Sequence, residues 1–308
     1  MPRDQVDLSV VIVSYNTRAI LLDCVSSIYH ATRDVTFEIV VIDNGSHDGS
    51  AAAIREQCPA VIVIVNPDNR GFARAANQGL AASRGRYVLF LNSDTRVLNG
   101  SLNHMVAYLD QHPDVGALGC LQKTGEGRPY RSWWPVPTLL EHIRYAEVGG
   151  LPLYDGGSDG TPDPDQWQRP QEVGWVNGAC LMLPAPLLRK LGGLDERFFM
   201  YFEDVDLCLR VRAAGYKVFY LPDAGIIHLV GASSRDVADS LNLEWELSRV
   251  LFVEKHFALI HRTLMKLWIL GGAVGRLARG LMRASAAGRR RRLLRHHWTS
   301  ISRVLGLG

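Results

Sequence analysis

The sequence predicts an α/β protein in which helices flank a mixed, mainly parallel sheet. Apolar, β-branched runs alternate with segments of helical periodicity from residue 8 to about residue 94. Strands that are joined by helices require parallel pairing with right-handed crossovers. The 308 residues, 47% of them hydrophobic, suffice for one large or two small domains. From about residue 239 onward the pattern is helical and basic, which predicts a C-terminal extension.

The elements follow from periodicity and from turn residues. Between residues 119 and 170 the periodicity is poor, and Gly, Pro, Asp and Trp are frequent, which is typical of a long loop over an active site. Ser46 is expected to cap the second helix. Strands are expected at 8–14, 37–43, 61–65, 87–92, within 174–183, at 217–221 and at 226–229, and helices at 19–30, 46–57, 71–83, 101–112, 185–191 and 203–214.

Charge is distributed unevenly along the chain. All 31 acidic residues lie at or before Glu254, and 12 of the 34 Lys and Arg residues follow it, so the first 254 residues carry −9 and the last 54 carry +12. This basic tail (residues 255–308) predicts an anionic partner surface. Its apolar run at 264–270 is too short for a membrane span of ~20 residues, whereas basic amphipathic helices suit a membrane interface. One alternative is a solvated terminal helix. The other is nucleic-acid binding, but the negative charge of the first 254 residues argues against it.

Cysteine usage and the N-terminus predict the compartment. The five cysteines are scattered, and no Cys-x-x-Cys pair occurs, so neither a zinc site nor a disulfide framework is expected. The first seven residues are polar and acidic, unlike a signal peptide. We therefore expect a cytoplasmic protein that lies peripherally at the inner face of the cell membrane, as a monomer or an oligomer.

Two predicted strands end in carboxylates. The apolar run from residue 87 ends in Asn92-Ser93-Asp94, and the run at 37–43 ends in Asp43. In an open α/β sheet, ligands bind beyond the carboxyl ends of the strands, where a carboxylate can hold a hard cation. Two such strand ends favour one shared site over two separate turn or helix caps, which is the alternative interpretation.

Two further groups of residues are candidates for chemistry. Gly71 opens a helix whose N-terminal amides can meet a phosphate, although an ordinary capped helix would look the same. The aromatic run 198–202 precedes Glu203 and Asp204, and apolar surroundings raise a carboxyl pKa toward the range of a general base. Alternatively, both acids only favour the positive end of the helix dipole. His228 follows a strand and would be structural unless a metal lies nearby.

Five motifs in one order resemble glycosyltransferase family 2, the inverting nucleotide-sugar transferases of GT-A fold. The resemblance covers about residues 8–234 and looks most like the bacterial rhamnosyltransferase branch, with Asn92 where an aspartate is commoner. The motifs are Val-Ile-Val-Ser-Tyr-Asn at 11–16, Val-Ile-Asp-Asn-Gly-Ser-His-Asp at 41–48, Asn-Arg-Gly-Phe-Ala-Arg-Ala-Ala-Asn at 69–77, Leu-Asn-Ser-Asp at 91–94 and Phe-Glu-Asp-Val-Asp-Leu-Cys-Leu-Arg at 202–210.

The resemblance implies a role for each matching residue. Asp204 would be the general base, with Glu203 as second choice, and Asp94 would bind Mn²⁺ or Mg²⁺, with His228 as a further ligand. Asn92 leaves the metal site one charge short. Asp43 would accept from the pyrimidine N3–H. The expected nucleotide-sugar-binding residues are Tyr15, Asn16, Asp43, Asn69, Gly71, Phe72, Asn77, Asn92 and Ser93, and the candidate acceptor or donor contacts are Arg131, Trp133, Trp134, Asn177 and Gly178.

The implied organisation is a GT-A domain at 1–238, with a nucleotide-binding half (1–118) and an acceptor and catalytic half (119–238), followed by a helical, amphipathic membrane-associating tail (239–308). The implied enzyme is a metal-assisted hexosyltransferase of polysaccharide biosynthesis or cell wall biogenesis. It would move rhamnose from dTDP-rhamnose to a glycan or to a polyprenyl-diphosphate-linked acceptor. The alternatives are a UDP-hexose donor and a nucleotide-sugar-binding protein without turnover.

Overall fold

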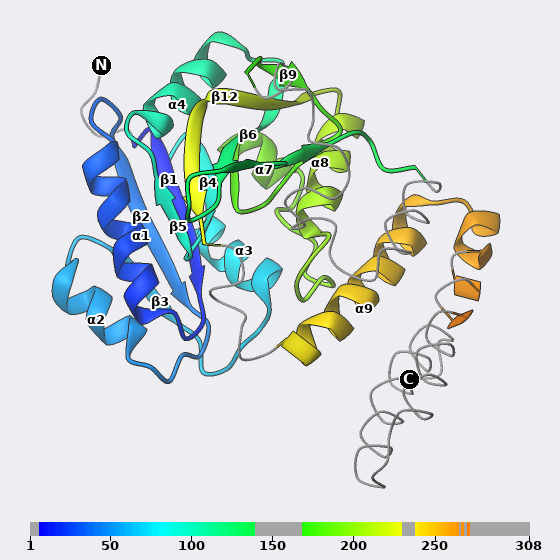
Figure 1. Cartoon of the computed structure of the whole chain (residues 1–308), viewed down its shortest axis with the longest axis horizontal. Coiled ribbons are helices and arrows are strands. Elements are labelled where there is room, and N and C mark those ends of the chain that lie inside the picture. Colours follow the sequence, from blue (N-terminus) through cyan, green and yellow to red (C-terminus); the bar gives the residue numbers. More distant parts are fainter. Residues whose placement is uncertain (1–5, 139–167, 230–237, 265, 268–269, 272–308) are drawn as a thin grey trace, which may run out of the picture. The chain divides into compact units, whose positions relative to one another are not determined.

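The computed structural model describes residues 6–138, 168–229, 238–264, 266–267 and 270–271. The chain divides into two compact units (Figure 1). Unit 1 comprises the residues up to Glu196 together with Glu203–Arg235, and unit 2 comprises Arg197–Phe202 and the residues from Asp236 onward. The domain boundary expected at residue 238 stays a prediction, and the segment 139–167 of the expected long loop lies outside the described residues.

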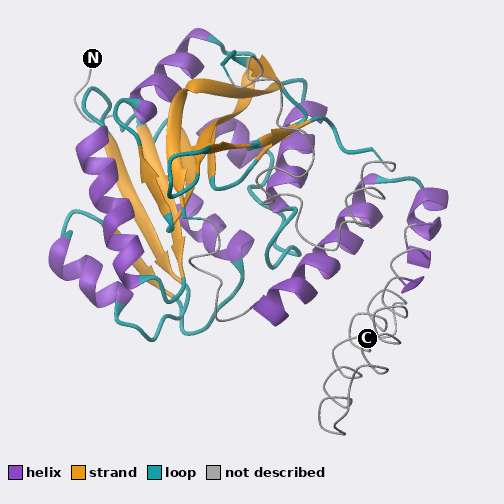
Figure 2. Ribbon diagram, viewed as in Figure 1, coloured by secondary structure: helices purple, strands orange, loops and turns teal. Residues whose placement is uncertain are grey.

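Unit 1 is built on one mixed sheet, drawn in orange in Figure 2, with the order β3-β2-β1-β4-β11-β6-β12-β5. Its first four strands are parallel, as the helical crossovers between them require. They are β1 (Leu8–Ser14), β2 (Phe37–Asp43), β3 (Ile62–Val65) and β4 (Tyr87–Asn92).

The sheet continues through a strand that runs the other way. β11 (Cys180–Pro184) is antiparallel to both β4 and β6 (Val115–Lys123), and β12 (Lys217–His228) is parallel to β6. Short strands extend this half: β5 (Thr95–Val97) and β9 (Gln171–Glu172) pair with β12, and β7 (Pro129–Tyr130) pairs with β6. A separate two-stranded sheet consists of β8 (Trp133–Trp134) and β10 (Trp175–Val176).

Helices cover both faces of the sheet. The alternating side chains of β1 separate the faces: Leu8, Val10 and Ile12 share a core cluster with α1, whereas Val11 faces Gly79 of α3. A Cβ at Gly79 would lie 2.3 Å from Val11 Cγ1, so only glycine allows this close approach. The helices of unit 1 are α1 (Arg18–Ala31), α2 (Ser50–Gln57), α3 (Phe72–Ala82), α4 (Ser101–Gln111), α7 (Ala185–Lys190) and α8 (Glu203–Ala213).

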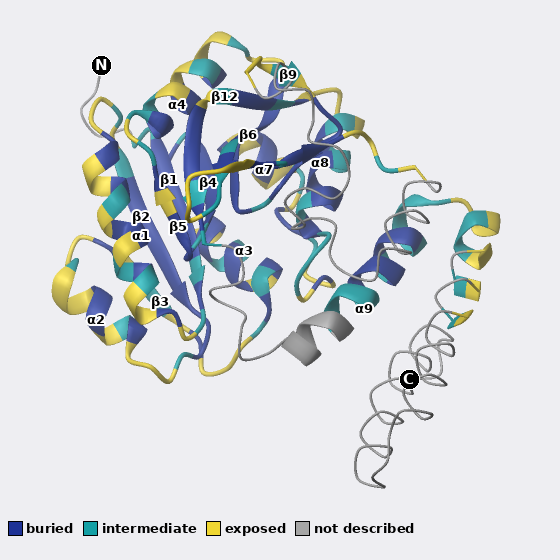
Figure 3. Cartoon of the chain, in the orientation of Figure 1, coloured by how far each residue is buried: buried dark blue, intermediate teal, exposed yellow. Residues whose placement is uncertain are grey.

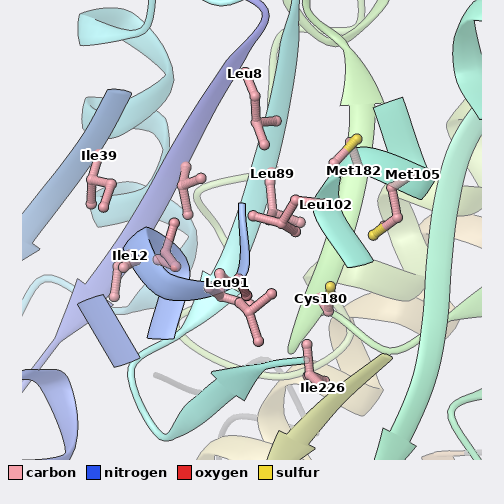
Figure 4. Packing of buried hydrophobic residues seen from close by; sticks show 14 of the residues in the cluster. Leu8, Ile12, Ile39, Leu89, Leu91, Leu102, Met105, Cys180, Met182 and Ile226 are labelled. Atoms are coloured by element: carbon pink, nitrogen blue, oxygen red, sulfur yellow. The ribbon is translucent and has the colours of Figure 1, made fainter. Parts of the chain in front are cut away.

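One cluster of buried apolar side chains joins β1, β2, β4, β11 and β12 (Figure 4). Leu89 and Leu91 of β4 pack with Met182 of β11 and Ile226 of β12, so the two halves of the sheet share one interior. The strands are therefore largely buried, while the outer sides of the helices are exposed (Figure 3). In unit 2, α9 (Ala238–His256) packs Trp245 and Phe252 against Phe202.

Three local expectations were wrong, and short strands were not foreseen. Residues 119–123 belong to β6 and are not part of a loop, because β6 lies between β11 and β12 in the sheet interior. The two strands expected at 217–221 and 226–229 are one strand, β12, with an irregularity between Leu221 and Gly225. The short strand β5 was not foreseen. Ser46 does not cap α2, which begins at Ser50 after Gly49.

Candidate active site

Asp43 lies at the carboxyl end of β2, where hydrogen bonds join the loop after β2 to the loop after β1. Ser14 pairs with Asp43 in the register, and the side chain of Asn16 accepts from His47 N–H at 2.8 Å while Asn16 N–H donates to Ser46 Oγ at 2.9 Å. Asp43 Oδ1 accepts from Ser46 N–H, three residues on, at 2.8 Å, which stabilises the turn after β2. Oδ2 is buried and lacks a hydrogen-bond partner. Tyr15 is partly buried in the loop after β1.

A network of asparagine side chains, of which Asn44 and Asn66 are buried, orients the next loop. Asn44 Nδ2 donates to Asn69 Oδ1 at 2.8 Å and to Gly71 O at 3.3 Å, and Asn44 Oδ1 accepts from Arg70 N–H at 3.2 Å. Asn66 donates to the same Oδ1 at 2.9 Å. Asn44 therefore fixes the conformation of the loop before α3, with Gly71 at a φ of 82° that favours glycine. Phe72 begins α3.

Asn77 lies one and a half turns into α3, and its amide is occupied by the protein. Its Nδ2 donates to Leu194 O at 2.8 Å and to Glu196 Oε1 at 3.1 Å, while its Oδ1 accepts from Leu194 N–H at 2.9 Å. In this structure Asn77 links α3 to the loop before α8. Its expected role in donor binding stays a prediction.

The end of β4 meets the end of β12. Asp94 and His228 are 2% and 3% exposed, and Asp94 Oδ1 lies 3.2 Å from His228 Nε2. Leu229 N–H donates to Asp94 O at 2.8 Å, which fixes the two chain segments side by side. Ser93 accepts from Thr17 Oγ1 at 3.3 Å and so ties the same turn to the loop after β1. Asn92, the last residue of β4, is partly buried.

Asp94 and His228 fit a divalent cation. A carboxylate oxygen and an imidazole nitrogen are ligands that Mn²⁺ accepts, and Mg²⁺ in proteins commonly takes one or two carboxylates together with substrate phosphates. Within the described part of the chain no group of three or more His, Cys, Asp and Glu side chains forms a complete metal cage. Asp94 and His228 would thus supply two of the ligands of such a cation.

The first turn of α8 carries the two candidate bases. Asp204 Oδ2 accepts from Gly178 N–H at 2.8 Å, and Oδ1 accepts from Val205 N–H at 2.8 Å. Burial raises the pKa of the Asp204 carboxyl above its ordinary value, and the two backbone donors oppose this rise. Burial, followed by the negative charge of Asp204, raises the pKa of Glu203 well above its usual range. Glu203 Oε2 is buried without a hydrogen-bond partner.

Two adjacent hydrogen bonds connect Asp204 to the strand that carries the metal candidate. Asn92 N–H donates to Ala179 O at 3.0 Å, and the preceding residue, Gly178, donates to Asp204. A Cβ on Gly178 would lie 3.1 Å from Asp204 Cβ, so the backbone of this loop touches the carboxylate side chain. The structure thereby brings Asp94, His228 and Asp204 to the same edge of the sheet.

The expected acceptor contacts form an aromatic group beside this edge. Trp134 stacks on Trp175 with ring centroids 4.2 Å apart, and the Arg131 guanidinium lies 5.1 Å from the Trp133 ring. Asn177 N–H donates to Ser132 O at 2.9 Å, which joins β8 and its flanks to the loop of Gly178. Trp133 and Trp134 are buried, so they support the loop as core residues do, while Arg131 remains partly exposed.

Sequence reasoning missed several residues of the site. Asn44 and Asn66 orient the loop of Gly71, and Tyr130, which donates to Gln122, contacts His228. Asn44 lies in the expected turn and in the motif at 41–48, but it was given no role of its own, although this asparagine was a visible signal. Tyr130 and Gln122 gave no signal, because 98 residues separate Tyr130 from His228.

This mixed sheet, with Asp43 and Asp94 at the ends of parallel strands, agrees with the fold that the five motifs predict. Residues 87–302 match the family described as Glycosyl transferase family group 2, and residues 9–152 match Glycosyl transferase family 2. The chain belongs to the family 2 glycosyltransferases. The predicted family, fold class and enzyme class are thereby confirmed.

Relatives and solved structures agree with this assignment. The chain is 29% identical to the N-acetylglucosaminyl-diphospho-decaprenol L-rhamnosyltransferase of Mycobacterium tuberculosis, over 94% of this chain and 97% of the relative. It is 24% identical to the low-salt glycan biosynthesis hexosyltransferase Agl10 of Haloferax volcanii, over 72% and 67%.

Among solved structures, the mannosyltransferase PcManGT of Pyrobaculum calidifontis, in complex with GDP-Man and Mn²⁺, matches with a TM-score of 0.56 and 19% identity over 99% of this chain and 86% of that one. GalNAc-T7 with UDP, GalNAc and Mn²⁺ matches with a TM-score of 0.59 and 18% identity over 82% and 48%. At these identities the two structures show the fold alone.

Proposed function

We propose that this protein is an inverting rhamnosyltransferase that moves the sugar from dTDP-rhamnose to a polyprenyl-diphosphate-linked glycan. The observation that carries the transfer chemistry is the pair of hydrogen bonds that ties Asp204 to the end of β4 through Gly178 and Ala179. The choice of sugar and acceptor rests on the mycobacterial relative, whose name specifies both and whose whole length the chain nearly spans.

The nucleotide would bind at the ends of β1 and β2. The buried, unpartnered Asp43 Oδ2 suits the N3–H of a pyrimidine base, because a buried acceptor without a donor is costly. Thymine and uracil both carry this N–H, so Asp43 selects a pyrimidine of this kind and leaves the choice between dTDP and UDP to other contacts. The amide network of Asn44 would hold the loop of Asn69 and Gly71 ready for the rest of the donor.

Asp94 and His228 would hold Mn²⁺ or Mg²⁺ against the donor diphosphate. When bound, the cation supplies Lewis-acid stabilisation of the charge that develops on the leaving diphosphate. Because Asn92 cannot add a second carboxylate, binding of the cation would depend on His228 and on the diphosphate itself.

Asp204 would take the proton of the acceptor hydroxyl as its oxygen forms the bond to the anomeric carbon. The bond from that carbon to the diphosphate breaks on the opposite face, so a single displacement inverts the centre and needs no protein nucleophile. Burial favours this role because it raises the carboxyl pKa and strengthens the carboxylate as a base.

Donor assays with the full chain test this function. dTDP-rhamnose, UDP-hexoses and GDP-mannose are each supplied with Mn²⁺ and a polyprenyl-diphospho-N-acetylglucosamine acceptor, and the anomeric configuration of the product is determined by NMR. Transfer from dTDP-rhamnose with inversion supports the proposal. Transfer from a UDP-hexose alone would show that the donor is a UDP-hexose and not dTDP-rhamnose. The absence of metal-dependent transfer or hydrolysis with every donor would contradict the enzymatic proposal.

Asp204→Asn tests the general base. The variant should lose at least 100-fold in kcat, since general-base catalysis contributes about 10²–10⁴-fold. Binding of the nucleotide, measured by calorimetry, should be unchanged, because the proposed nucleotide contact Asp43 lies at the end of β2 and Asp204 lies on α8. Turnover equal to that of the unmodified protein would refute the assignment and would leave Glu203 as the next candidate.

We further propose that unit 2 docks on an anionic membrane, which would keep the enzyme beside a lipid-linked acceptor. Leu259, Ile260, Leu264 and Leu267 are 76%, 68%, 52% and 61% exposed. At about 100° per residue they fall on one side of a helix, with Arg262 and Lys266 beside them. In the described residues no helix is both long and apolar enough to cross a bilayer.

Liposome co-sedimentation tests this surface. The double variant Leu259→Gln and Leu264→Gln should release the protein from phosphatidylglycerol vesicles. Each substitution removes a leucine side chain whose burial in the membrane contributes about 1.5–3 kcal/mol of transfer free energy. High salt should also weaken binding, because the basic tail contributes about 1 kcal/mol per lysine or arginine near anionic lipid. Binding that is unaffected by both changes would exclude this surface.

A further inference from the structure

A buried hydrogen-bonded chain lies behind His228, on the side away from Asp94. Tyr130 Oη lies 2.6 Å from His228 Nδ1 and donates its proton to Gln122 Oε1, also at 2.6 Å. Gln122, Tyr130 and His228 are 1%, 6% and 3% exposed. We call these three residues the Gln122–Tyr130–His228 chain.

The sheet sets the position of each member. Gln122 of β6 pairs directly with Tyr130 of β7 on one side and with Ile226 of β12 on the other. His228 lies two residues beyond Ile226 and therefore on the same face of β12. Three strands thus bring the three polar side chains together in the interior, where exposure of at most 6% leaves little access for water.

The protons of this chain can be assigned from its donors and acceptors. A tyrosine hydroxyl has one proton, and here it is given to Gln122 Oε1, so the hydroxyl oxygen can only accept from His228. Nδ1 must then carry a proton. A neutral imidazole has one protonated nitrogen, which leaves the lone pair of Nε2 directed at Asp94, 3.2 Å away.

We propose that Tyr130 and Gln122 are positioning residues that hold His228 as the Nδ1–H tautomer and so present Nε2 to the divalent cation at Asp94. This inference rests on the proposed metal role of Asp94 and His228. Partners of this kind orient the ring and tune its basicity, and their loss typically weakens metal binding about 10- to 100-fold. Without the Tyr130 hydroxyl, the ring proton can move to Nε2 and donate to Asp94, where it competes with the cation.

The tautomer is measured directly by ¹⁵N NMR of the histidine rings in the metal-free full chain, which reports on the two ring nitrogens separately. In the unmodified protein Nδ1 of His228 should be protonated. In Tyr130→Phe the proton should move to Nε2, and the same should happen in Gln122→Met, because the freed Tyr130 hydroxyl would then donate to Nδ1. An unprotonated Nδ1 in the unmodified protein would overturn the proposal.

Mn²⁺ binding, followed by electron paramagnetic resonance of the free ion, gives the second readout. Tyr130→Phe and Gln122→Met should each weaken Mn²⁺ at least about 10-fold. Tyr108→Phe is the matched control, since Tyr108 stacks on His112 at 4.0 Å in another part of unit 1. It should change neither the His228 tautomer nor Mn²⁺ affinity.

The two proposals fail in different ways. If Asp94→Asn and His228→Ala both retain the unmodified affinity for Mn²⁺, the metal site is wrong, whatever the tautomer. If these variants lose Mn²⁺ while Tyr130→Phe retains it and keeps Nδ1 protonated, the metal site stands and the positioning role is refuted. Circular dichroism melting of each variant shows whether a loss of binding reflects unfolding.

Discussion

Gly178→Ala should impair catalysis by displacing the Asp204 carboxylate. The new methyl group would lie 3.1 Å from Asp204 Cβ and 3.2 Å from Oδ2, a few tenths of an ångström closer than an ordinary van der Waals contact. Gly178 N–H also donates to the same Oδ2 at 2.8 Å, so relief of the contact lengthens or bends this hydrogen bond.

The size of the effect follows from these two changes. A hydrogen bond to a charged group is worth about 1.5–3 kcal/mol, so its partial loss costs on the order of 1 kcal/mol, or about fivefold in rate. A misplacement of about 1 Å at a reacting group can cost 10²-fold, and a shift of a few tenths costs a smaller part of that. We therefore expect kcat/KM to fall about 5- to 50-fold, with nucleotide affinity unchanged.

Initial rates with donor and acceptor at saturating Mn²⁺ measure this effect, and calorimetry with the nucleotide product measures binding. Gly125→Ala is the matched control, because its methyl group would meet only the flexible side chain of Leu229, also at 3.2 Å. A Gly178→Ala enzyme with a rate within twofold of the unmodified protein would refute the contact between this loop and a catalytic Asp204.

Four further outcomes are expected. Because burial raises the Asp204 pKa and a base must be ionised, the acid limb of the kcat profile should lie above the ordinary aspartate pKa of about 3.9; a limb at or below that value would count against Asp204. Burial also raises the pKa of Glu203, so the folded protein holds a proton that the unfolded chain releases, and stability should fall as pH rises from about 4.3. Glu203→Gln should flatten this decline in thermal melts recorded between pH 4 and 8. Asn44→Ala should lower the free energy of unfolding by about 1–3 kcal/mol and weaken nucleotide binding, and equal affinity in calorimetry would show that the amide network does not shape the donor loop. Arg210→Ala should destabilise the protein by about 3–5 kcal/mol in urea unfolding, because the Arg210 guanidinium bonds the fully buried Asp206 at 2.8 Å.

The sequence determined the parallel half of the sheet and its carboxylates. Apolar runs such as the one before Asn92 are local signals, because a strand that is buried on both faces must be apolar throughout. The strand-end positions of Asp43 and Asp94 follow from the same runs, since ligands bind at the carboxyl ends of parallel strands. The five ordered motifs added the family, and the fold and the family matches confirm it.

Only the tertiary structure decided which distant residues meet. Residues 119–123 of β6 were taken as part of a loop because Gly, Pro, Asp and Trp are frequent from residue 119 onward, yet side chains of neighbouring elements fill the space at Gly116 and Gly119 of this strand. Gly178 meets Asp204 across 26 residues, and Tyr130 meets His228 across 98. No periodicity encodes such contacts, because they arise from strand order and register, which depend on the packing of the whole sheet. The sequence therefore supplied the acids, and the sheet determined the hydrogen-bond partners that orient them.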